Sequence, residues 1–278
     1  MIKTAISVES SADVPAELAL KYDIKIIPYQ ITLGEQVFRD GEKSPEEMFE
    51  FVDRYKTLPK TTALNEFEYT EFFESLKRDY DAVIHICLSG GITSSCDNAF
   101  RAAEKLKNVF VVDSRSLSMG TGYLAIIARE LIGKGASPEE TVGKLKEAVK
   151  KDITAFVVER LDYLHKGGRC SSIALLGANL LKIRPRIIMK DGKMVSDKKY
   201  RGNMAKVISD FVGDLTDEFP PSDDTVCIAY TTATDEMIAA ATDKCKAAGF
   251  KNVIMTRAGA TISSHCGANT LGVFYITE

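Results

Sequence analysis

Three consecutive hydroxyl side chains, Thr93, Ser94 and Ser95, follow a pair of glycines at Gly90-Gly91. Hydroxyl groups and the free N–H groups at the start of a helix bind anions, because the helix dipole places partial positive charge there. Glycines allow a ligand to approach the backbone closely. These residue types indicate a small pocket for a carboxylate or a phosphate, with an ordinary helix N-cap as the alternative.

The segments on either side of this turn have the patterns that such a pocket needs. Residues 82–88 form an apolar run that predicts a buried strand, and residues 95–106 predict a helix. The hydroxyl-bearing turn would therefore connect the end of a buried strand to the N-terminus of a helix.

Three other places carry residues suited to binding an anion. Thr61 and Thr62 are adjacent hydroxyls in a polar loop, and they could equally be helix caps. His265 lies in a stretch of small residues, 263–269, which predicts a surface loop of the kind that commonly carries sites. Arg169 ends the basic turn Lys166-Gly167-Gly168-Arg169, which would bind phosphate or simply be solvated.

Several common sites are missing from the sequence. No G-x-x-x-x-G-K-[ST] loop and no G-x-S-x-G elbow is present. Residues 120–125 spell G-x-G-x-x-A, but the preceding strand ends too far upstream for a dinucleotide site. With three histidines, of which His85 lies in an apolar strand and is expected in the core, we expect no multi-histidine metal cluster and no cofactor.

The composition sets limits on the class of protein. The chain has 278 residues, 45% of them hydrophobic and 27% charged, which is enough for one large or two ordinary domains. A net charge of −3 gives no electrostatic case for nucleic acid. We expect no transmembrane segment and no secretory signal, and six scattered cysteines are typical of a reducing cytoplasm.

Strands and helices alternate as far as about residue 153, which predicts a parallel sheet covered on both faces. Strands are expected at 4–8, 24–33, 82–88 and 108–112, and capping boxes at Ser44 and Ser137 each open a helix. The pattern then changes. Asp191-Gly192 signals a hairpin, a helix is expected at 172–182, and further strands are expected at 225–230, 253–257 and 273–276. We therefore predict an N-terminal α/β domain at 1–153 and a mixed α/β domain at 154–278.

Ordered motifs along the whole chain resemble those of the DegV family of bacterial fatty-acid-binding proteins. Val8–Pro15 is similar to the family's D-S-T-x-D-L-P, with Glu9 in place of aspartate, and Pro59–Thr62 to its T-S-Q-P segment. Ser89–Ser95 resembles S-S-x-L-S-G-T, with Thr93 at the serine and Ser94 at the glycine. The most specific match is Glu159–Arg169, and the chain closes with a likeness to H-x-G-P-G-x-L-G from His265.

The resemblance implies a lipid-binding protein of the two-domain DegV type, with a Rossmann-like parallel α/β/α domain followed by the mixed domain. A long-chain fatty acid would lie in an apolar tunnel, with its carboxylate held at the domain interface by Thr61, Thr93 and His265. Thr62 and Ser94 are adjacent candidates. The resemblance also implies a partner kinase that phosphorylates the bound acid to an acyl phosphate, with Arg169 meeting the kinase or the phosphate.

Two other functions stay open at this point. Thr93 or Ser94 with His265 could hydrolyse an acyl ester, although no elbow and no orienting acid is evident. A lipid sensor that binds without transferring the acid is the second alternative. The length, saturation and branching of the acid depend on packing that the sequence does not reveal.

Overall fold

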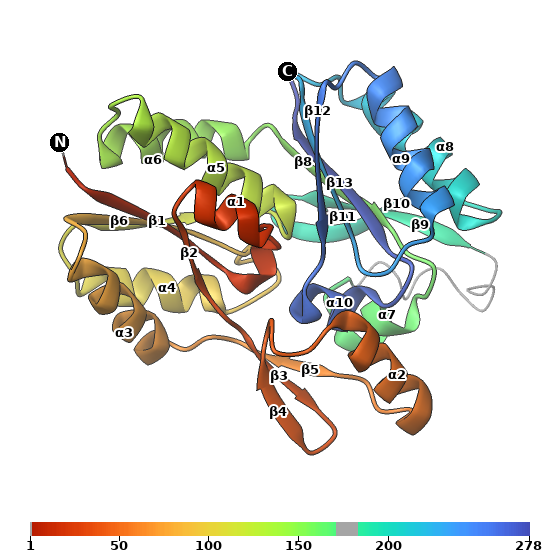
Figure 1. The fold of residues 1–278 in the computed structure, drawn as a ribbon, viewed down its shortest axis with the longest axis horizontal. Coiled ribbons are helices and arrows are strands. Elements are labelled where there is room, and N and C mark those ends of the chain that lie inside the picture. The colour runs from red at the N-terminus through yellow and green to blue at the C-terminus, as the bar shows by residue number, and fades with distance from the viewer. Residues whose placement is uncertain (1, 171–182) are drawn as a thin grey trace.

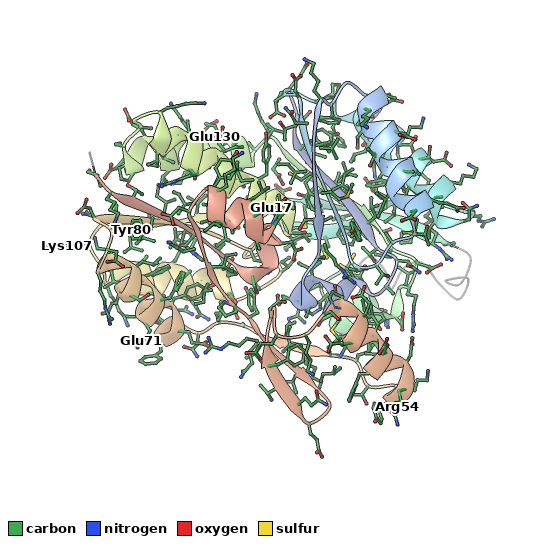
Figure 2. All side chains as sticks on the ribbon, in the orientation of Figure 1. Glu17, Arg54, Glu71, Tyr80, Lys107 and Glu130 are labelled. Atoms are coloured by element: carbon green, nitrogen blue, oxygen red, sulfur yellow. The ribbon has the colours of Figure 1, made fainter. Side chains whose placement is uncertain are left out.

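The computed structural model describes residues 2–170 and 183–278 (Figure 1). Three sheets organise this part of the chain. Charged side chains such as Glu71 and Glu130 project from the outer faces of the helices (Figure 2). The helix expected at 172–182 lies outside the described residues.

The first sheet is parallel, as the alternation of strands and helices predicts. Its strand order is β2-β1-β6-β7, and every residue of β1 and β6 is buried. Figure 1 shows α5 and α6 on one face of this sheet and α3 and α4 on the other, which explains the continuous apolar runs. The strands are β1 (Thr4–Glu9), β2 (Ile24–Ile27), β6 (Ala82–Cys87) and β7 (Val109–Asp113), and the helices are α1 (Ala16–Lys21), α3 (Glu66–Lys77), α4 (Ser95–Glu104), α5 (Met119–Gly133) and α6 (Pro138–Val149), with a short 3₁₀ turn at Ser10–Ala12.

The two predicted capping boxes are both formed. Ser44 caps α2 (Pro45–Tyr55), and Ser137 caps α6. In each box the serine hydroxyl accepts from the N–H three residues on, and the glutamate at that position accepts from the serine N–H.

The second sheet is mixed, as the hairpin signal predicts. Its order is β10-β9-β8-β13-β11-β12, in which only β11 and β12 are parallel neighbours. Asp191 and Gly192 both have positive φ and turn β9 into β10. The strands are β8 (Asp152–Val157), β9 (Arg184–Lys190), β10 (Lys193–Tyr200), β11 (Thr225–Tyr230), β12 (Asn252–Arg257) and β13 (Leu271–Ile276), covered by α8 (Met204–Glu218) and α9 (Asp235–Ala247).

The third sheet corrects two expectations. Residues 24–33 are not one strand: β2 ends before Pro28, and Gln30–Leu33 is a separate strand, β3, between β4 (Gln36–Arg39) and β5 (Lys60–Thr62). The first part of the small-residue stretch at 263–269 is not a loop either, because Ala260–Cys266 forms a helix, α10, and only residues 267–269 follow it as a turn. The third sheet, α2, α10 and α7 (Asp162–Gly167) share a core that includes Ile31, Met48 and Tyr163.

The turn after β6 and the turn between β9 and β10 meet at one hydrogen bond. Ser89 Oγ donates a hydrogen bond of 2.7 Å to the carbonyl oxygen of Gly192. A side chain at Gly91 would collide with that same carbonyl, so glycine is required there. The turn that carries Thr93 is thereby fixed against the β9–β10 hairpin. The division into domains at residues 153 and 154 stays a prediction.

In the described part of the chain, every helix is too short or too polar to span a lipid bilayer.

Candidate functional site

A narrow cavity lies where strand β5 and helix α10 meet the carboxyl ends of the strands of the first sheet. About 540 Å³ of space is left between its lining side chains, part of it open to solvent. Most of the lining is apolar. It consists of Tyr29, Thr61, Ala63, Leu88, Ile92, Thr93, Leu117, Arg169, Met194, Thr261, Ile262, His265 and Cys266.

Thr61 and His265 meet in this cavity although 204 positions separate them in the sequence. The Thr61 hydroxyl and His265 Nε2 are 2.8 Å apart and hydrogen-bonded. Burial, with a smaller effect from the positive charge of Arg169, lowers the pKa of His265 to about 4. The imidazole is therefore neutral at neutral pH.

The other imidazole nitrogen has a close neighbour but no hydrogen bond. His265 Nδ1 is buried and has no partner among the described residues. A Cβ atom at Gly167 would lie 2.7 Å from it, so this glycine gives the ring its room. The histidine side chain is thus held between β5 and α7.

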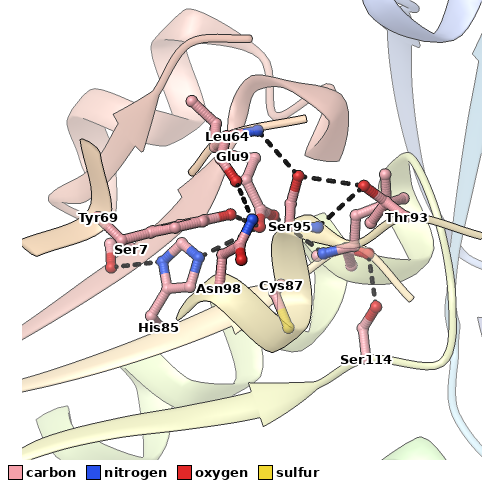
Figure 3. Close-up of polar contacts among 12 residues, drawn as sticks. Ser7, Glu9, Leu64, Tyr69, His85, Cys87, Thr93, Ser95, Asn98 and Ser114 are labelled. Atoms are coloured by element: carbon pink, nitrogen blue, oxygen red, sulfur yellow. Dashed lines mark hydrogen bonds and ion pairs between the residues drawn. The ribbon is translucent and has the colours of Figure 1, made fainter. Parts of the chain in front are cut away.

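Thr93 belongs to a chain of hydrogen bonds at the N-terminus of α4 (Figure 3). Its hydroxyl donates to Ser95 Oγ at 3.0 Å and accepts from the Ser95 N–H at 3.2 Å. Ser95 Oγ in turn accepts from the Leu64 N–H at 3.1 Å. The segment after β5 and the start of α4 are thereby joined, which brings Thr61 and Thr93 to the same cavity.

Two hydroxyl groups that sequence reasoning missed also line the cavity. Tyr29 Oη and Thr261 Oγ1 are both buried, and Thr261 Oγ1 has no hydrogen-bond partner among the described residues. Burial raises the pKa of Tyr29 well above its usual value, although the neighbouring Ser95 and Thr93 hydroxyls oppose the shift, so the phenol keeps its proton. Buried polar groups in proteins are almost always paired, so the unpartnered Thr261 hydroxyl beside the Tyr29 phenol suits a polar ligand.

The remaining predicted residues lie nearer to the surface. Thr62 is exposed and does not line the cavity. Ser94 is also exposed, and it borders a shallower outer cavity together with Thr93 and Arg169. Arg169 lines both of these cavities and a third, basic one with Lys56, and its guanidinium donates to the Gly167 carbonyl at 2.6 Å. It stands at the mouth of the site.

A second, smaller and mostly apolar cavity lies beside the first, toward the second sheet. It shares the lining residues Leu117, Ile262 and Cys266 with the first cavity and measures about 260 Å³, part of it open to solvent. Beyond these it is bordered by strands of the second sheet, at Phe156, Ala229, Gly272 and Phe274 among others. The hydroxyl groups, the histidine and the arginine therefore gather in the first cavity, and its neighbour is mostly apolar.

A buried polar cluster lies beside the hydroxyl-bearing turn (Figure 3). Glu9 accepts hydrogen bonds from Tyr69 Oη at 2.6 Å and from the Leu88 N–H at 2.9 Å. His85 Nε2 lies 3.3 Å from Glu9, and its Nδ1 lies 3.0 Å from Ser7 Oγ. The expectation that His85 is a satisfied core residue is confirmed.

Comparisons with known proteins agree on one family. A family model described as "Uncharacterised protein, DegV family" matches residues 3–278. The "Fatty acid-binding protein" of Thermotoga maritima is 34% identical over 226 residues, which cover 79% of this chain and 78% of that protein. "Protein DegV" of Bacillus subtilis is 32% identical over 275 residues, covering 97% of both chains.

Solved structures confirm the fold. The crystal structure of Bacillus subtilis DegV, described as a fatty acid binding protein, superposes with a TM-score of 0.87 at 27% identity, covering 100% of both chains. A DegV family protein from Thermus thermophilus superposes with a TM-score of 0.91 at 23% identity, again over 100% of both chains. The α/β class, with one parallel and one mixed sheet, is therefore shared with solved structures.

Proposed function

The chain belongs to the DegV family, and from that premise we propose that it binds a long-chain fatty acid. The carboxylate would occupy the cavity between Thr61, Thr93 and His265. The alkyl tail would run from there into the neighbouring apolar cavity beside the second sheet, so that the two cavities form one apolar passage. The observation that carries this proposal is the gathering of hydroxyl groups and a neutral imidazole in a mostly apolar cavity, with the buried Thr261 hydroxyl left without a partner among the described residues.

The chemistry of the polar end suits a carboxylate. A carboxylate partly removed from water needs several hydrogen-bond donors, and hydroxyl groups supply them without a fixed charge. A neutral His265 with its proton on Nε2 donates to Thr61 Oγ1, which leaves the Thr61 hydroxyl proton for the ligand.

The apolar passage suits an alkyl chain. Burying each methylene contributes about 0.8 kcal/mol, so a long chain binds tightly with few polar contacts. Leu117 and Ile262 line both cavities, and the chain would pass between them. The tail then lies against Phe156 and Ala229.

The first test is whether the protein holds an acid, and where. Native mass spectrometry of the purified chain should detect a bound long-chain fatty acid. Thr93→Ala should weaken binding by about 1–3 kcal/mol, because the Thr93 hydroxyl would turn its proton from Ser95 Oγ to the bound head group and the variant has no such proton. Ser94→Ala is the matched control in the same turn, since the Ser94 side chain makes no cap hydrogen bond and should matter less. Equal effects of the two changes, or none, would place the carboxylate elsewhere.

We further propose that the bound acid is presented to a separate kinase that forms an acyl phosphate. Exposed Arg169, at the mouth of the site, is suited to contact the phosphate or the kinase. With ATP and a fatty acid kinase, the loaded protein should yield acyl phosphate. Arg169→Ala should lower that yield and leave the bound acid in place. If no acyl phosphate forms with a competent kinase, the sensor role is favoured.

The geometry gives less support to an ester hydrolase. The hydrogen-bond partner of His265 Nε2 is Thr61 rather than Thr93 or Ser94, and no carboxylate partners Nδ1 among the described residues. Such catalysis requires a nucleophile hydrogen-bonded to a base, and an acid hydrogen-bonded to that base to orient it. Turnover of a chromogenic acyl ester, abolished by His265→Ala, would reverse this preference.

A further inference from the structure

Two thiols and one carboxylate meet beneath the turn at Gly90. The Sγ atoms of Cys87 and Cys96 and a carboxylate oxygen of Asp113 all lie within 4.8 Å of one another. Within residues 2–170 and 183–278, no other three histidine, cysteine or acidic side chains come together at this spacing. Neither the scattered cysteines nor the motifs of the sequence signal this cluster.

Rigid elements hold all three ligand atoms. Cys87 and Asp113 are the last residues of the parallel strands β6 and β7, where they stand directly opposite each other. Cys96 is the second residue of α4. Both cysteines are buried and Asp113 is half-buried.

One oxygen of the carboxylate is available to a ligand. Asp113 Oδ1 accepts from the Gly90 N–H at 3.3 Å and from the Arg115 N–H at 2.8 Å. Oδ2 faces the place where Gly90 has no side chain, since a Cβ there would lie 3.3 Å from Oδ2 and 3.6 Å from Cys96 Sγ. Gly90 itself is exposed, so the cluster lies directly beneath the surface.

We propose that Cys87, Cys96 and Asp113 bind a thiophilic divalent cation of the Zn²⁺ class. Tetrahedral zinc with bonds of about 2.3 Å to sulfur and about 2.1 Å to oxygen needs ligand atoms roughly 3.5–3.8 Å apart, which small side-chain movements achieve here. As each metal–sulfur bond forms, the thiol releases its proton to solvent, and a water fills the fourth position. Two sulfur ligands favour zinc over magnesium or calcium, which prefer oxygen alone.

The proposed ion would link the two ends of the segment that carries Thr93. Residues 88–95 run between Cys87 and Cys96, and Asp113 ties that segment to β7. The metal site does not depend on fatty acid binding, and it can be tested on the protein with or without lipid.

The experiment titrates Co²⁺ into the reduced, metal-free, tag-free full chain. Wild-type protein should bind about one Co²⁺ with thiolate charge-transfer absorption in the near ultraviolet and ligand-field bands in the visible, and Zn²⁺ should displace it. Cys96→Ala should abolish the charge-transfer bands of this site. Asp113→Asn, which keeps an oxygen for the Gly90 and Arg115 N–H groups, should weaken binding by about tenfold or more.

Cys245→Ala is the matched control, because Cys245 is also a buried cysteine on a helix but lies in the core of the second sheet. It should leave the spectrum unchanged. Absence of saturable thiolate absorption in wild type, or equal absorption in Cys96→Ala, would overturn the proposal. So would a Cys87–Cys96 disulfide that forms in air while the reduced protein takes up no metal, since the pair would then be a redox couple.

Discussion

Two carboxylates, Asp13 and Asp40, hold the N-terminus of α10. Asp13 Oδ1 accepts from the Gly259 N–H at 2.8 Å, and the oxygens of Asp40 accept from the Ala260 and Thr261 N–H groups at 2.8 and 3.2 Å. Because α10 carries Thr261 and His265, these carboxylates position one wall of the proposed lipid site.

The ionisation of Asp13 should make stability depend on pH. Burial, assisted by the nearby charge of Asp40, raises the pKa of Asp13 to about 8 from 3.8, although hydrogen bonds from Ser118 and Gly259 oppose the shift. The folded protein thus holds a proton that the unfolded chain has lost. Stability should fall as pH rises from about 4 to about 8, by up to about 1.4 kcal/mol per pH unit, and level off above.

Asp13→Asn should flatten this dependence, because the amide keeps an acceptor for Gly259 and cannot ionise. Thermal unfolding of wild type and variant across the range from about pH 4 to about pH 9 checks this difference. Asp217→Asn on the exposed face of α8 is the control and should follow the wild-type curve. A variant that parallels wild type would show that Asp13 is ionised in the folded protein.

Only some of the residues that line the cavity could be predicted from the sequence. Thr61, Thr93 and His265 stand in motifs, so their types and context suggested a common site, and the structure places their side chains around one cavity. Tyr29 and Thr261 carry no such signal. They matter because their hydroxyl groups are buried in the cavity, and Thr261 has no partner there among the described residues, which only the packing of distant segments determines.

Among the helices and strands, local sequence signals were reliable where residues close in sequence determine the structure. Both predicted capping boxes are formed, because those hydrogen bonds join residues three apart. The parallel strands were visible as apolar runs.

The errors arose where distant residues decide the structure. Helix α10 consists largely of small and hydroxyl residues without an apolar period, and its first N–H groups are satisfied by Asp13 and Asp40 from more than 200 positions away. The strand predicted at 24–33 is divided because Pro28 offers no N–H to a neighbouring strand. The second half then pairs with β4 and β5 instead.

At the scale of the whole molecule, the site exists because three sheets meet. The alternation of strands and helices predicted one parallel and one mixed sheet, and both are present. The depth of the proposed passage between them depends on which side chains face it, and the alternation of strands and helices says nothing about that. Ala229 in β11 is one residue that leaves this space open.

Filling the passage at Ala229 should separate long acids from short ones. Ala229→Leu places extra methyl groups in the space of about 260 Å³ beside Phe156, so palmitate affinity should fall by about tenfold or more while octanoate affinity changes little. Isothermal titration with both acids measures this difference. Ala155→Leu is the control, because it overpacks the separate core between the second sheet and its helices without entering the passage. A similar loss of affinity for both acids, or the same selectivity in Ala155→Leu, would mean that the tail takes another route. A loss for palmitate alone in Ala229→Leu would establish the direction in which the alkyl chain runs from the polar end.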